Sequence, residues 1–208
     1  MRLILASTSP RRREILALLG LPFGVIQPAF EEVISCERSI EEEVIEFAIG
    51  KAQSVARQNP QAIVIGSDTM ISLDGVKIGK PRDLSDARAM LCKLAGRTHF
   101  IYTSVAIIDG LGGSGLKVLE KVTVKMRDFC EAEAEDYLAC GESLDKAGAY
   151  SIQGEGSQLI ASIDGDYLAA VGLPLKPVAE YLKDRGIALP LNVDRLYANK
   201  SFLNWQSF

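Results

Sequence analysis

The sequence has few of the side chains on which many catalytic and metal sites depend. Its 208 residues include one histidine, His99, and four cysteines, none of them in a C-x-x-C pair. Histidine-dependent triads, H-E-x-x-H zinc sites and multi-histidine metal sites are therefore hard to assemble. Unpaired cysteines within predicted helices and strands indicate buried free thiols in a reducing cytosol rather than disulfides or zinc ligands. Catalysis must then use carboxylates, hydroxyls, lysine or arginine, with or without a hard metal ion held by oxygen.

Long apolar runs and a surplus of basic residues are also absent. No apolar stretch approaches the ~20 residues that cross a bilayer, and the run from Leu3 to Ala6 is too short for the hydrophobic region of a signal peptide. The net charge of −4 argues against nucleic acid as a main partner, because binding to a phosphate backbone needs clustered basic residues. We therefore expect a cytoplasmic protein that binds neither membranes nor nucleic acid.

The order of the apolar segments predicts an α/β protein. Early segments alternate strand and helix, as parallel βα units do, and two long strands follow later. This order favours a mixed β-sheet flanked by helices, in two lobes with a cleft. The glycine-rich segment 109–115 is typical of a hairpin tip, since a phosphate loop should open a helix. The predicted strands are 3–6, 23–26, 62–66, 98–108, 117–127 and 159–163, and the predicted helices are 11–19, 39–58, 85–94, 131–139 and 174–185.

The first strand, loop and helix concentrate groups that bind anions. Ser9 suits the N-cap of a helix and Pro10 its first position. A helix N-terminus offers free backbone N–H groups and the positive end of a dipole. Residues 11–13 are all arginine, which opposes that dipole unless an external anion is bound there. On the residues alone, an anion site and a solvated basic patch are equally good interpretations.

Asp68 is the second candidate. It follows the most strand-like segment of the chain, and α/β sheets place ligand sites at the carboxyl ends of their strands. A carboxylate there can bind Mg²⁺ or accept a proton from an attacking water. The alternative is that Asp68 caps a turn or a helix.

Several other polar residues are ambiguous when taken singly. Lys80 lies in a predicted loop and Lys51 within a predicted helix, and lysines in such places are usually solvated. Gln153 carries an amide that can read a base edge, yet polar loop residues commonly have no such role. Glu31 and Glu32 precede a polar loop and need no function. Only the combination of these residues supports a prediction.

That combination resembles the Maf family of nucleoside triphosphate pyrophosphatases. Each matching motif is short, but seven of them occur in the family's order as far as about residue 186. Ser67 stands where the family often has alanine and Ala95 where it often has serine, and neither change removes a reactive group. The motifs are L-A-S-T-S-P-R-R at 5–12, G-S-D-T at 66–69, G-K-P at 79–81, G-R-T-H at 96–99 with Thr103, D-K-A-G-A-Y at 145–150, I-Q-G at 152–154 and G-L-P-L at 172–175.

The resemblance implies a fold like that of the inosine triphosphatases, a homodimer, and a divalent metal cation. Mg²⁺ is the expected cation, with Mn²⁺ and Co²⁺ as alternatives. The resemblance also implies that Asp68 accepts the proton of the attacking water and contacts the metal. The residues that would bind the triphosphate are Ser7, Arg11, Arg12, Lys51 and Lys80, with Glu31 as an acidic helper.

Substrate choice also follows from the resemblance. In the branch of the family that hydrolyses dTTP and UTP, the specificity positions correspond to Arg12, Thr69 and Gln153. We therefore predict hydrolysis of dTTP, UTP and modified pyrimidine nucleotides to the monophosphate and pyrophosphate. One alternative is 7-methyl-GTP hydrolysis, although that branch departs from the D-K-A-G and I-Q-G patterns. The other is a nucleotide-binding regulator of septum formation without turnover.

The family-like domain is predicted to span residues 1–186, which leaves 187–208 as a C-terminal tail. The tail carries three large aromatic residues, Phe202, Trp205 and Phe208. Its sequence is compatible with a docked segment and with a disordered one, and the resemblance assigns it no role.

Overall fold

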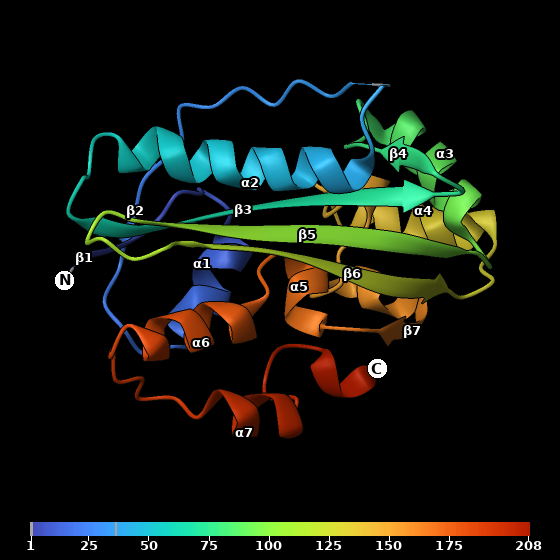
Figure 1. The fold of residues 1–208 in the computed structure, drawn as a ribbon. Coiled ribbons are helices and arrows are strands. Elements are labelled where there is room, and N and C mark those ends of the chain that lie inside the picture. The colour runs from blue at the N-terminus through green and yellow to red at the C-terminus, as the bar shows by residue number, and fades with distance from the viewer. Residues whose placement is uncertain (1, 36) are drawn as a thin grey trace. The chain divides into compact units, whose positions relative to one another are not determined.

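The computed structural model describes residues 2–35 and 37–208 and is built on a seven-stranded mixed sheet (Figure 1). The strand order is β2-β1-β3-β5-β6-β7, with β4 paired to β3. Strands β2 and β3 both run parallel to β1, whereas β4 is antiparallel to β3 and β7 is antiparallel to β6. The predicted fold class, an α/β protein with a mixed sheet and flanking helices, is confirmed.

Apart from β3, which is longer than predicted, the predicted helices and strands agree with the observed ones within a few residues. The sequence did not predict β4, α5 or α7. The strands are β1 (Arg2–Leu5), β2 (Gly24–Val25), β3 (Ala62–Leu73), β4 (Val76–Ile78), β5 (Thr98–Asp109), β6 (Leu116–Met126) and β7 (Ile160–Asp164). The α-helices are α1 (Pro10–Ala17), α2 (Ile40–Ala56), α3 (Leu84–Leu94), α4 (Glu131–Ala139), α5 (Tyr167–Val171), α6 (Leu175–Asp184) and α7 (Val193–Ala198). Three short 3₁₀ helices are η1 (Ala147–Ala149), η2 (Glu155–Leu159) and η3 (Trp205–Ser207).

The chain divides into two compact units, and the long strands β3, β5 and β6 pass from one into the other. The first unit contains Met1–Thr69, Tyr102–Glu120 and Leu168–Asn199. The second unit contains Met70–Ile101, Lys121–Tyr167 and Lys200–Phe208.

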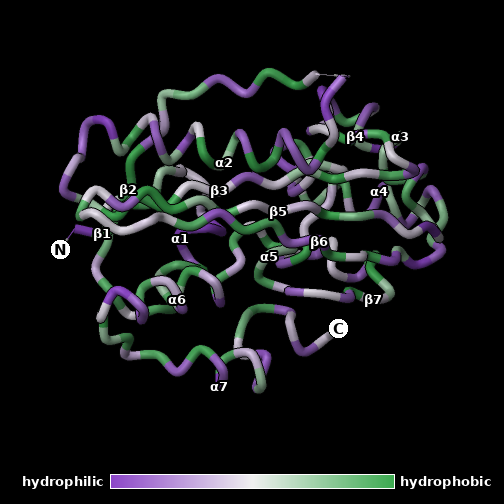
Figure 2. The backbone as a smooth tube through the Cα atoms, viewed as in Figure 1, coloured by the Kyte–Doolittle hydropathy of each residue, from purple (hydrophilic) through white to green (hydrophobic). Residues whose placement is uncertain are grey.

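In the first unit, helix α2 packs closely on β3. The predicted capping box is present, since Ser39 and Glu42 bond each other's backbone N–H. Hydrophobic and hydrophilic residues alternate along the turns of α2 (Figure 2), as expected of a helix with one buried face. A Cβ on Gly66 of β3 would collide with backbone atoms of Ala48 and Ala52 in α2. Glycine at residue 66 therefore allows the close approach that brings the next turn of α2 against β3.

We expect Gly66→Ala to lower the free energy of unfolding by roughly 1–3 kcal/mol, because the added methyl group overpacks a backbone contact. Urea denaturation of the purified variant measures this change. Gly79→Ala is the matched control, since a Cβ there meets no atom within 4 Å. Equal stability of the two variants would contradict the close packing of α2 on β3.

Strand β3 is longer than the sequence predicted. It continues through Asp68 to Leu73, whereas the prediction ended it at Gly66. The strand ends at the predicted turn, where Asp74 and Gly75 have φ angles of 51° and 79°, and β4 then pairs back with it. Asp68 therefore lies within the strand and not beyond its end.

The second unit buries His99 beside Tyr150. The His99 Nε2 atom lies 2.7 Å from the Tyr150 hydroxyl, and the rings meet edge to face. Burial lowers the pKa of His99 to about 4, so the imidazole is neutral at pH 7. Among the described residues, its Nδ1 has no hydrogen-bond partner.

His99 should make folding stability depend on pH. Its pKa falls from 6.5 in the unfolded chain to about 4 in the folded one, so the unfolded state binds more protons between these values. Stability is then lost as pH falls from 6.5 towards 4, by on the order of 3 kcal/mol. We expect His99→Gln to flatten the curve of unfolding free energy against pH in this window. An unchanged slope would show that His99 is not buried in its neutral form.

The cysteines correct one expectation. Cys92, Cys130 and Cys140 are free, as predicted, but they are exposed rather than buried. Cys92 lies on α3 between the buried Leu91 and an exposed lysine, and the other two flank α4. Cys36 lies outside the described residues.

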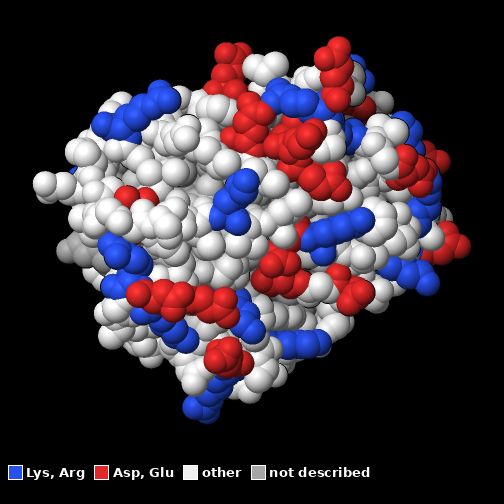
Figure 3. Space-filling view, viewed as in Figure 1, with Lys and Arg blue, Asp and Glu red and all other residues white. Residues whose placement is uncertain are grey.

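Charges of both signs are interspersed on the face of the molecule in Figure 3. In the second unit, exposed ion pairs connect α3 to α4, where Arg88 contacts Glu131 at 3.4 Å and also contacts Glu135. Such exposed pairs each contribute little to stability. Within the described part of the chain, no helix combines the length and apolarity that crossing a membrane requires.

Candidate active site

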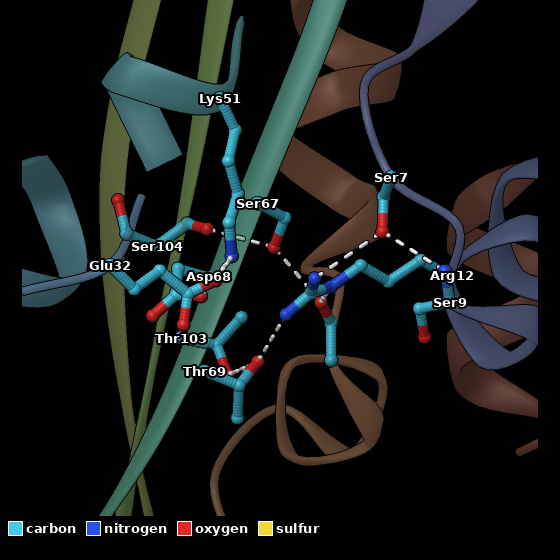
Figure 4. Close-up of polar contacts among 11 residues, drawn as sticks. Ser7, Ser9, Arg12, Glu32, Lys51, Ser67, Asp68, Thr69, Thr103 and Ser104 are labelled. Carbon is cyan, nitrogen blue, oxygen red and sulfur yellow. Dashed lines mark hydrogen bonds and ion pairs between the residues drawn. The ribbon is translucent and has the colours of Figure 1, made fainter. Parts of the chain in front are cut away.

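The first unit gathers a group of polar side chains around Asp68 (Figure 4). Asp68 on β3 and Lys51 on α2 are both buried, with 5% and 7% of their surfaces exposed. The Lys51 ammonium lies 2.5 Å from Asp68 Oδ1 and 2.6 Å from Glu32 Oε1. One cation thus contacts two carboxylates, and the close packing of α2 on β3 near Gly66 brings it within reach of Asp68.

Burial governs the protonation of Asp68. It raises the pKa of Asp68 above its ordinary value, and the nearby cations Lys51 and Arg12 limit the increase. The charge of Glu32 raises the same pKa slightly further. A carboxylate with a raised pKa is a stronger proton acceptor than an exposed aspartate, which suits it to act as a general base.

Arg12 is held in place by three hydrogen bonds. Its Nε donates to the Gly172 carbonyl oxygen at 2.9 Å and its Nη2 to Thr69 Oγ1 at 3.2 Å. Its Nη1 donates to Ser7 Oγ at 3.4 Å. A guanidinium has five N–H donors, so the remaining ones are available to a ligand in a fixed orientation. Burial lowers the pKa of Arg12, with the charge of Asp68 opposing that shift.

The hydroxyl groups of Thr69 and Thr103 form a hydrogen-bonded chain that ends on Arg12. Thr103 Oγ1 lies 2.8 Å from the Ala169 carbonyl oxygen and 3.0 Å from Thr69 Oγ1. A carbonyl only accepts, so the Thr103 proton goes to Ala169, and the Thr69 hydroxyl donates to Thr103. Thr69 is then oriented to accept from Arg12, which means that Thr69 is fixed before any ligand binds.

Helix α5 and the turn that follows it complete this support. The Ser67 hydroxyl lies 2.8 Å from the Ser104 carbonyl oxygen and 2.9 Å from that of Gly172. Gly172 has a φ of 136°, which only glycine adopts readily. Its carbonyl oxygen accepts from Arg12 Nε and also lies within reach of the single Ser67 hydroxyl proton, for which the Ser104 carbonyl competes. The quoted motif G-L-P-L contains this glycine, but the sequence did not indicate its bond to Arg12.

The start of α1 has no side-chain cap among the described residues. Ser9 is the N-cap, as predicted, but its side chain makes no capping hydrogen bond, and the first turn holds no acidic residue. The Ser9 N–H itself donates to Ser7 Oγ at 3.2 Å. Arg13 is exposed, as a solvated basic patch would require, whereas Arg12 is bound within the unit. The arginines of this turn therefore differ in their surroundings, and the anion site stays a prediction.

The chemistry of the donor set fits a divalent cation shared with a substrate. Two carboxylates, Asp68 and Glu32, already share one ammonium. Mg²⁺ is commonly held by one or two carboxylates together with substrate phosphates. In residues 2–35 and 37–208 no group of three or more His, Cys, Asp or Glu side chains could hold a metal ion.

Comparison with known proteins identifies the family. The model of the family described as Maf-like protein matches residues 2–185. The chain belongs to the Maf family. It is similar to the dTTP/UTP pyrophosphatase of Dictyoglomus thermophilum, with 45% identity over 188 residues that cover 90% of this chain and 97% of the relative. It is also 42% identical to the dTTP/UTP pyrophosphatase of Moorella thermoacetica over 186 residues, covering 89% of this chain and 96% of the relative.

These similarities confirm the Maf resemblance that the seven motifs indicated. Among solved structures, the Ham1 protein of Staphylococcus aureus is similar over 62% of this chain and 73% of its own. That similarity is weak, with a TM-score of 0.44 and 18% sequence identity.

The Maf-like site residues predicted from the sequence fall in both units. The first unit brings Lys51, Asp68, Thr69 and Arg12 together with Ser7. Arg11 is half-buried in the first turn of α1.

Besides Asp68, Lys51 contacts Glu32, whose side chain is 48% exposed. The neighbouring Glu31, which the resemblance suggested as the acidic helper, is exposed. The extended segment that precedes α2 carries both residues, and the sequence offered no periodicity there to distinguish them.

The second unit contains two further predicted residues of the Maf motifs, Lys80 and Gln153. Lys80 is exposed and follows Gly79, whose carbonyl oxygen accepts from the Gly148 N–H at 3.1 Å. This hydrogen bond joins the G-K-P motif to the D-K-A-G-A-Y motif. The Nε2 atom of Gln153 is buried, and among the described residues it has no hydrogen-bond partner. A buried donor without a partner is costly, so a ligand that accepts from it would bind favourably.

Proposed function

We propose that this Maf-family chain hydrolyses dTTP, UTP and modified pyrimidine nucleotides to the monophosphate and pyrophosphate. The observation that carries the proposal is the buried Asp68 carboxylate, held by Lys51 beside a fixed Arg12. Such an arrangement suits removal of a proton from water next to a bound polyphosphate. The names of the similar proteins, dTTP/UTP pyrophosphatases, support the substrate class.

In the proposed reaction, Asp68 accepts a proton from the attacking water. The water oxygen bonds to phosphorus, the anhydride between the α- and β-phosphates breaks, and pyrophosphate leaves. Lys51 orients the Asp68 carboxylate. Arg11, Arg12 and the open N–H groups at the start of α1 would bind the phosphates, with Lys80 as a further cation. Because phosphoryl chemistry depends mainly on positioning and charge neutralisation, these cations would supply much of the rate.

A divalent cation is part of this proposal. Asp68 and Glu32 would hold Mg²⁺, or alternatively Mn²⁺ or Co²⁺, together with oxygens of the substrate. When bound, the cation supplies positive charge that neutralises the phosphate oxygens. Lys51 and the cation would then both contact the Asp68 and Glu32 carboxylates.

The specificity residues of the proposal are Arg12, Thr69 and Gln153. The unpartnered Gln153 Nε2 is a hydrogen-bond donor. Thymine and uracil present a carbonyl acceptor at C4, whereas cytosine presents an amino donor there. An amide donor that reads this position would therefore favour dTTP and UTP over dCTP.

Parallel measurement of pyrophosphate release from dTTP, UTP, dCTP and 7-methyl-GTP with Mg²⁺ tests the proposed function. We expect kcat/KM for dTTP and UTP to exceed that for dCTP by at least about tenfold, the order of discrimination that one matched hydrogen bond supplies. Faster turnover of 7-methyl-GTP than of dTTP would overturn the substrate assignment. Binding of dTTP without release of pyrophosphate would instead favour the regulator of septum formation.

We also propose that the chain is a cytoplasmic homodimer, as the family resemblance implies. Analytical ultracentrifugation at micromolar concentration would test the dimer. A species with the mass of one chain would contradict it.

A further inference from the structure

The C-terminal segment 200–208 packs within the second unit, against residues of the Maf-like part of the chain. The Trp205 ring stacks on the Tyr167 ring, with centroids 5.2 Å apart and an interplanar angle of 13°. Phe208 also stacks on Tyr167, at 6.0 Å. The Tyr167 hydroxyl donates to the Leu203 carbonyl oxygen at 2.6 Å. Of the two states compatible with its sequence, this part of the tail therefore adopts the docked one, although it lies beyond the family match at 2–185.

Asn204 in this segment bonds the backbone of the I-Q-G motif. Its Nδ2 lies 2.9 Å from the Gln153 carbonyl oxygen and 3.4 Å from those of Ile152 and Gly154. The backbone of Asn204 is left-handed, with a φ of 60°, a conformation that asparagine tolerates better than most residues. The amide thus points at three consecutive carbonyl groups from one position.

The backbone N–H groups of this loop are bonded by residues outside segment 200–208. The Gly154 N–H donates to Ser151 Oγ at 3.2 Å, and the Glu155 N–H donates to the Glu142 carboxylate at 3.1 Å. A Cβ on Gly154 would collide with that same carboxylate. These contacts restrain the backbone N–H groups of the loop, whereas Asn204 restrains its carbonyl groups.

Gln153, whose backbone these contacts restrain, has a side-chain donor that is not used within the described residues. Gln153 Nε2 is buried and has no partner among the described residues, while the Gln153 carbonyl makes the shortest of the three Asn204 bonds. A small shift of this peptide would change the direction of the side-chain amide. Misplacement of a contact group by about 1 Å can cost up to roughly 100-fold in rate.

We propose that Asn204 is a positioning residue for the base-reading amide of Gln153, and that segment 200–208 is a specificity element attached to the Maf-like domain. The inference rests on the proposed role of Gln153 in reading the pyrimidine base. Asn204 acts through the loop and not on the substrate. The aromatic stacking on Tyr167 anchors the segment, and the Asn204 amide sets the loop.

Two substitutions isolate the amide. Asn204→Asp keeps the shape and the left-handed backbone but directs carboxylate oxygens at three carbonyl oxygens. Asn204→Gly keeps the backbone conformation and removes the side chain, so it has no repulsion. Ser201→Ala is the matched control in the same segment, since Ser201 is exposed. Gln153→Ala gives the full effect of losing the reading amide.

The first measurement is hydrogen exchange of the backbone amides at 151–155. We expect at least fivefold faster exchange in Asn204→Asp than in the unchanged protein and in Ser201→Ala. Exchange that stays unchanged in both Asn204 variants would overturn the positioning role, whatever the enzyme hydrolyses.

The second measurement is the ratio of kcat/KM for dTTP to that for dCTP. We expect this ratio to fall about tenfold in Asn204→Asp and about threefold in Asn204→Gly, mainly through a higher KM for dTTP. A uniform loss on both nucleotides would indicate a merely structural role and overturn the proposal. The proposal would also be overturned if Gln153→Ala lowers this ratio of kcat/KM values while both Asn204 variants leave it unchanged.

The controls separate this failure from failure of the proposed function. If the unchanged protein releases no pyrophosphate from dTTP, the proposed function is wrong. The hydrogen-exchange measurement still tests whether Asn204 positions the loop at 151–155. If Gln153→Ala leaves the ratio unchanged, Gln153 does not read the base, and the specificity role of segment 200–208 is overturned with it.

Discussion

Asp68→Asn is expected to lower kcat for dTTP hydrolysis by about 1,000-fold, within the range that a general base contributes. The substitution keeps the size of the side chain and removes the proton acceptor. Nucleotide binding should be much less affected, because the proposed phosphate ligands, Arg11, Arg12 and the start of α1, are unchanged. Pyrophosphate release under saturating dTTP and Mg²⁺ measures kcat, and titration with a non-hydrolysable analogue measures affinity.

The matched control for this substitution is Asp74→Asn, at the turn that ends the same strand. Asp74 is exposed and pairs with Arg97 of the second unit. Its left-handed φ of 51° suits asparagine, so the control should keep its activity. Retention of more than a third of kcat in Asp68→Asn would exclude Asp68 as the base, and some other group would then have to accept the proton.

Lys51→Met is expected to lower kcat/KM for dTTP by about 100-fold and to move its acid limb to higher pH. Lys51 lowers the pKa of Asp68, both by its charge and by its hydrogen bond. Without the ammonium, burial acts on Asp68 with less opposition, so its pKa rises further. More of the carboxylate is then protonated at a given acidic pH, and activity is lost sooner as pH falls.

Profiles of kcat/KM between pH 5 and 9 test this prediction. The control is Lys93→Met on α3, where the lysine is exposed in the last turn of the helix. The Lys51 variant leaves the buried Asp68 carboxylate without the ammonium that it shares with the exposed Glu32, so its folding is checked by circular dichroism at low temperature. A well-folded variant whose acid limb stays in place would contradict the coupling of Lys51 to Asp68.

Much of the fold could be predicted because its signals are local. Apolar periodicity located the helices and strands, the Ser39–Glu42 capping box marked the start of α2, and Asp74-Gly75 marked the turn after β3. Each signal needs only residues a few positions apart. Helix α5 was missed because it is short and buried, so it shows no amphipathic pattern.

The extent of β3 could not be predicted in the same way. Ser67 and Asp68 are polar, and a polar pair after an apolar run normally signals the end of a buried strand. Their partners lie far away in the sequence, on α2, on β5 and after α5. Those partners satisfy the buried polar groups, so the strand continues.

The choice between neighbouring or alternative residues likewise depended on tertiary contacts. Glu32 contacts Lys51, a pairing between the extended segment before α2 and that helix that no local pattern indicates. Cys92 was predicted to be buried because it lies within a predicted helix, but the rotation of α3 leaves it exposed.

The sequence by itself determined most of the elements, the family and the set of candidate site residues, since these are encoded in short patterns and in their order along the chain. Only the tertiary structure decided which donors are used and which are open. Arg12 is held by Gly172 and Thr69, and Asn204 bonds the loop of Gln153. Such bonds join residues more than 50 positions apart, where no local pattern reports on the pairing. They form because a buried polar group must find a partner wherever the folded chain brings one within reach.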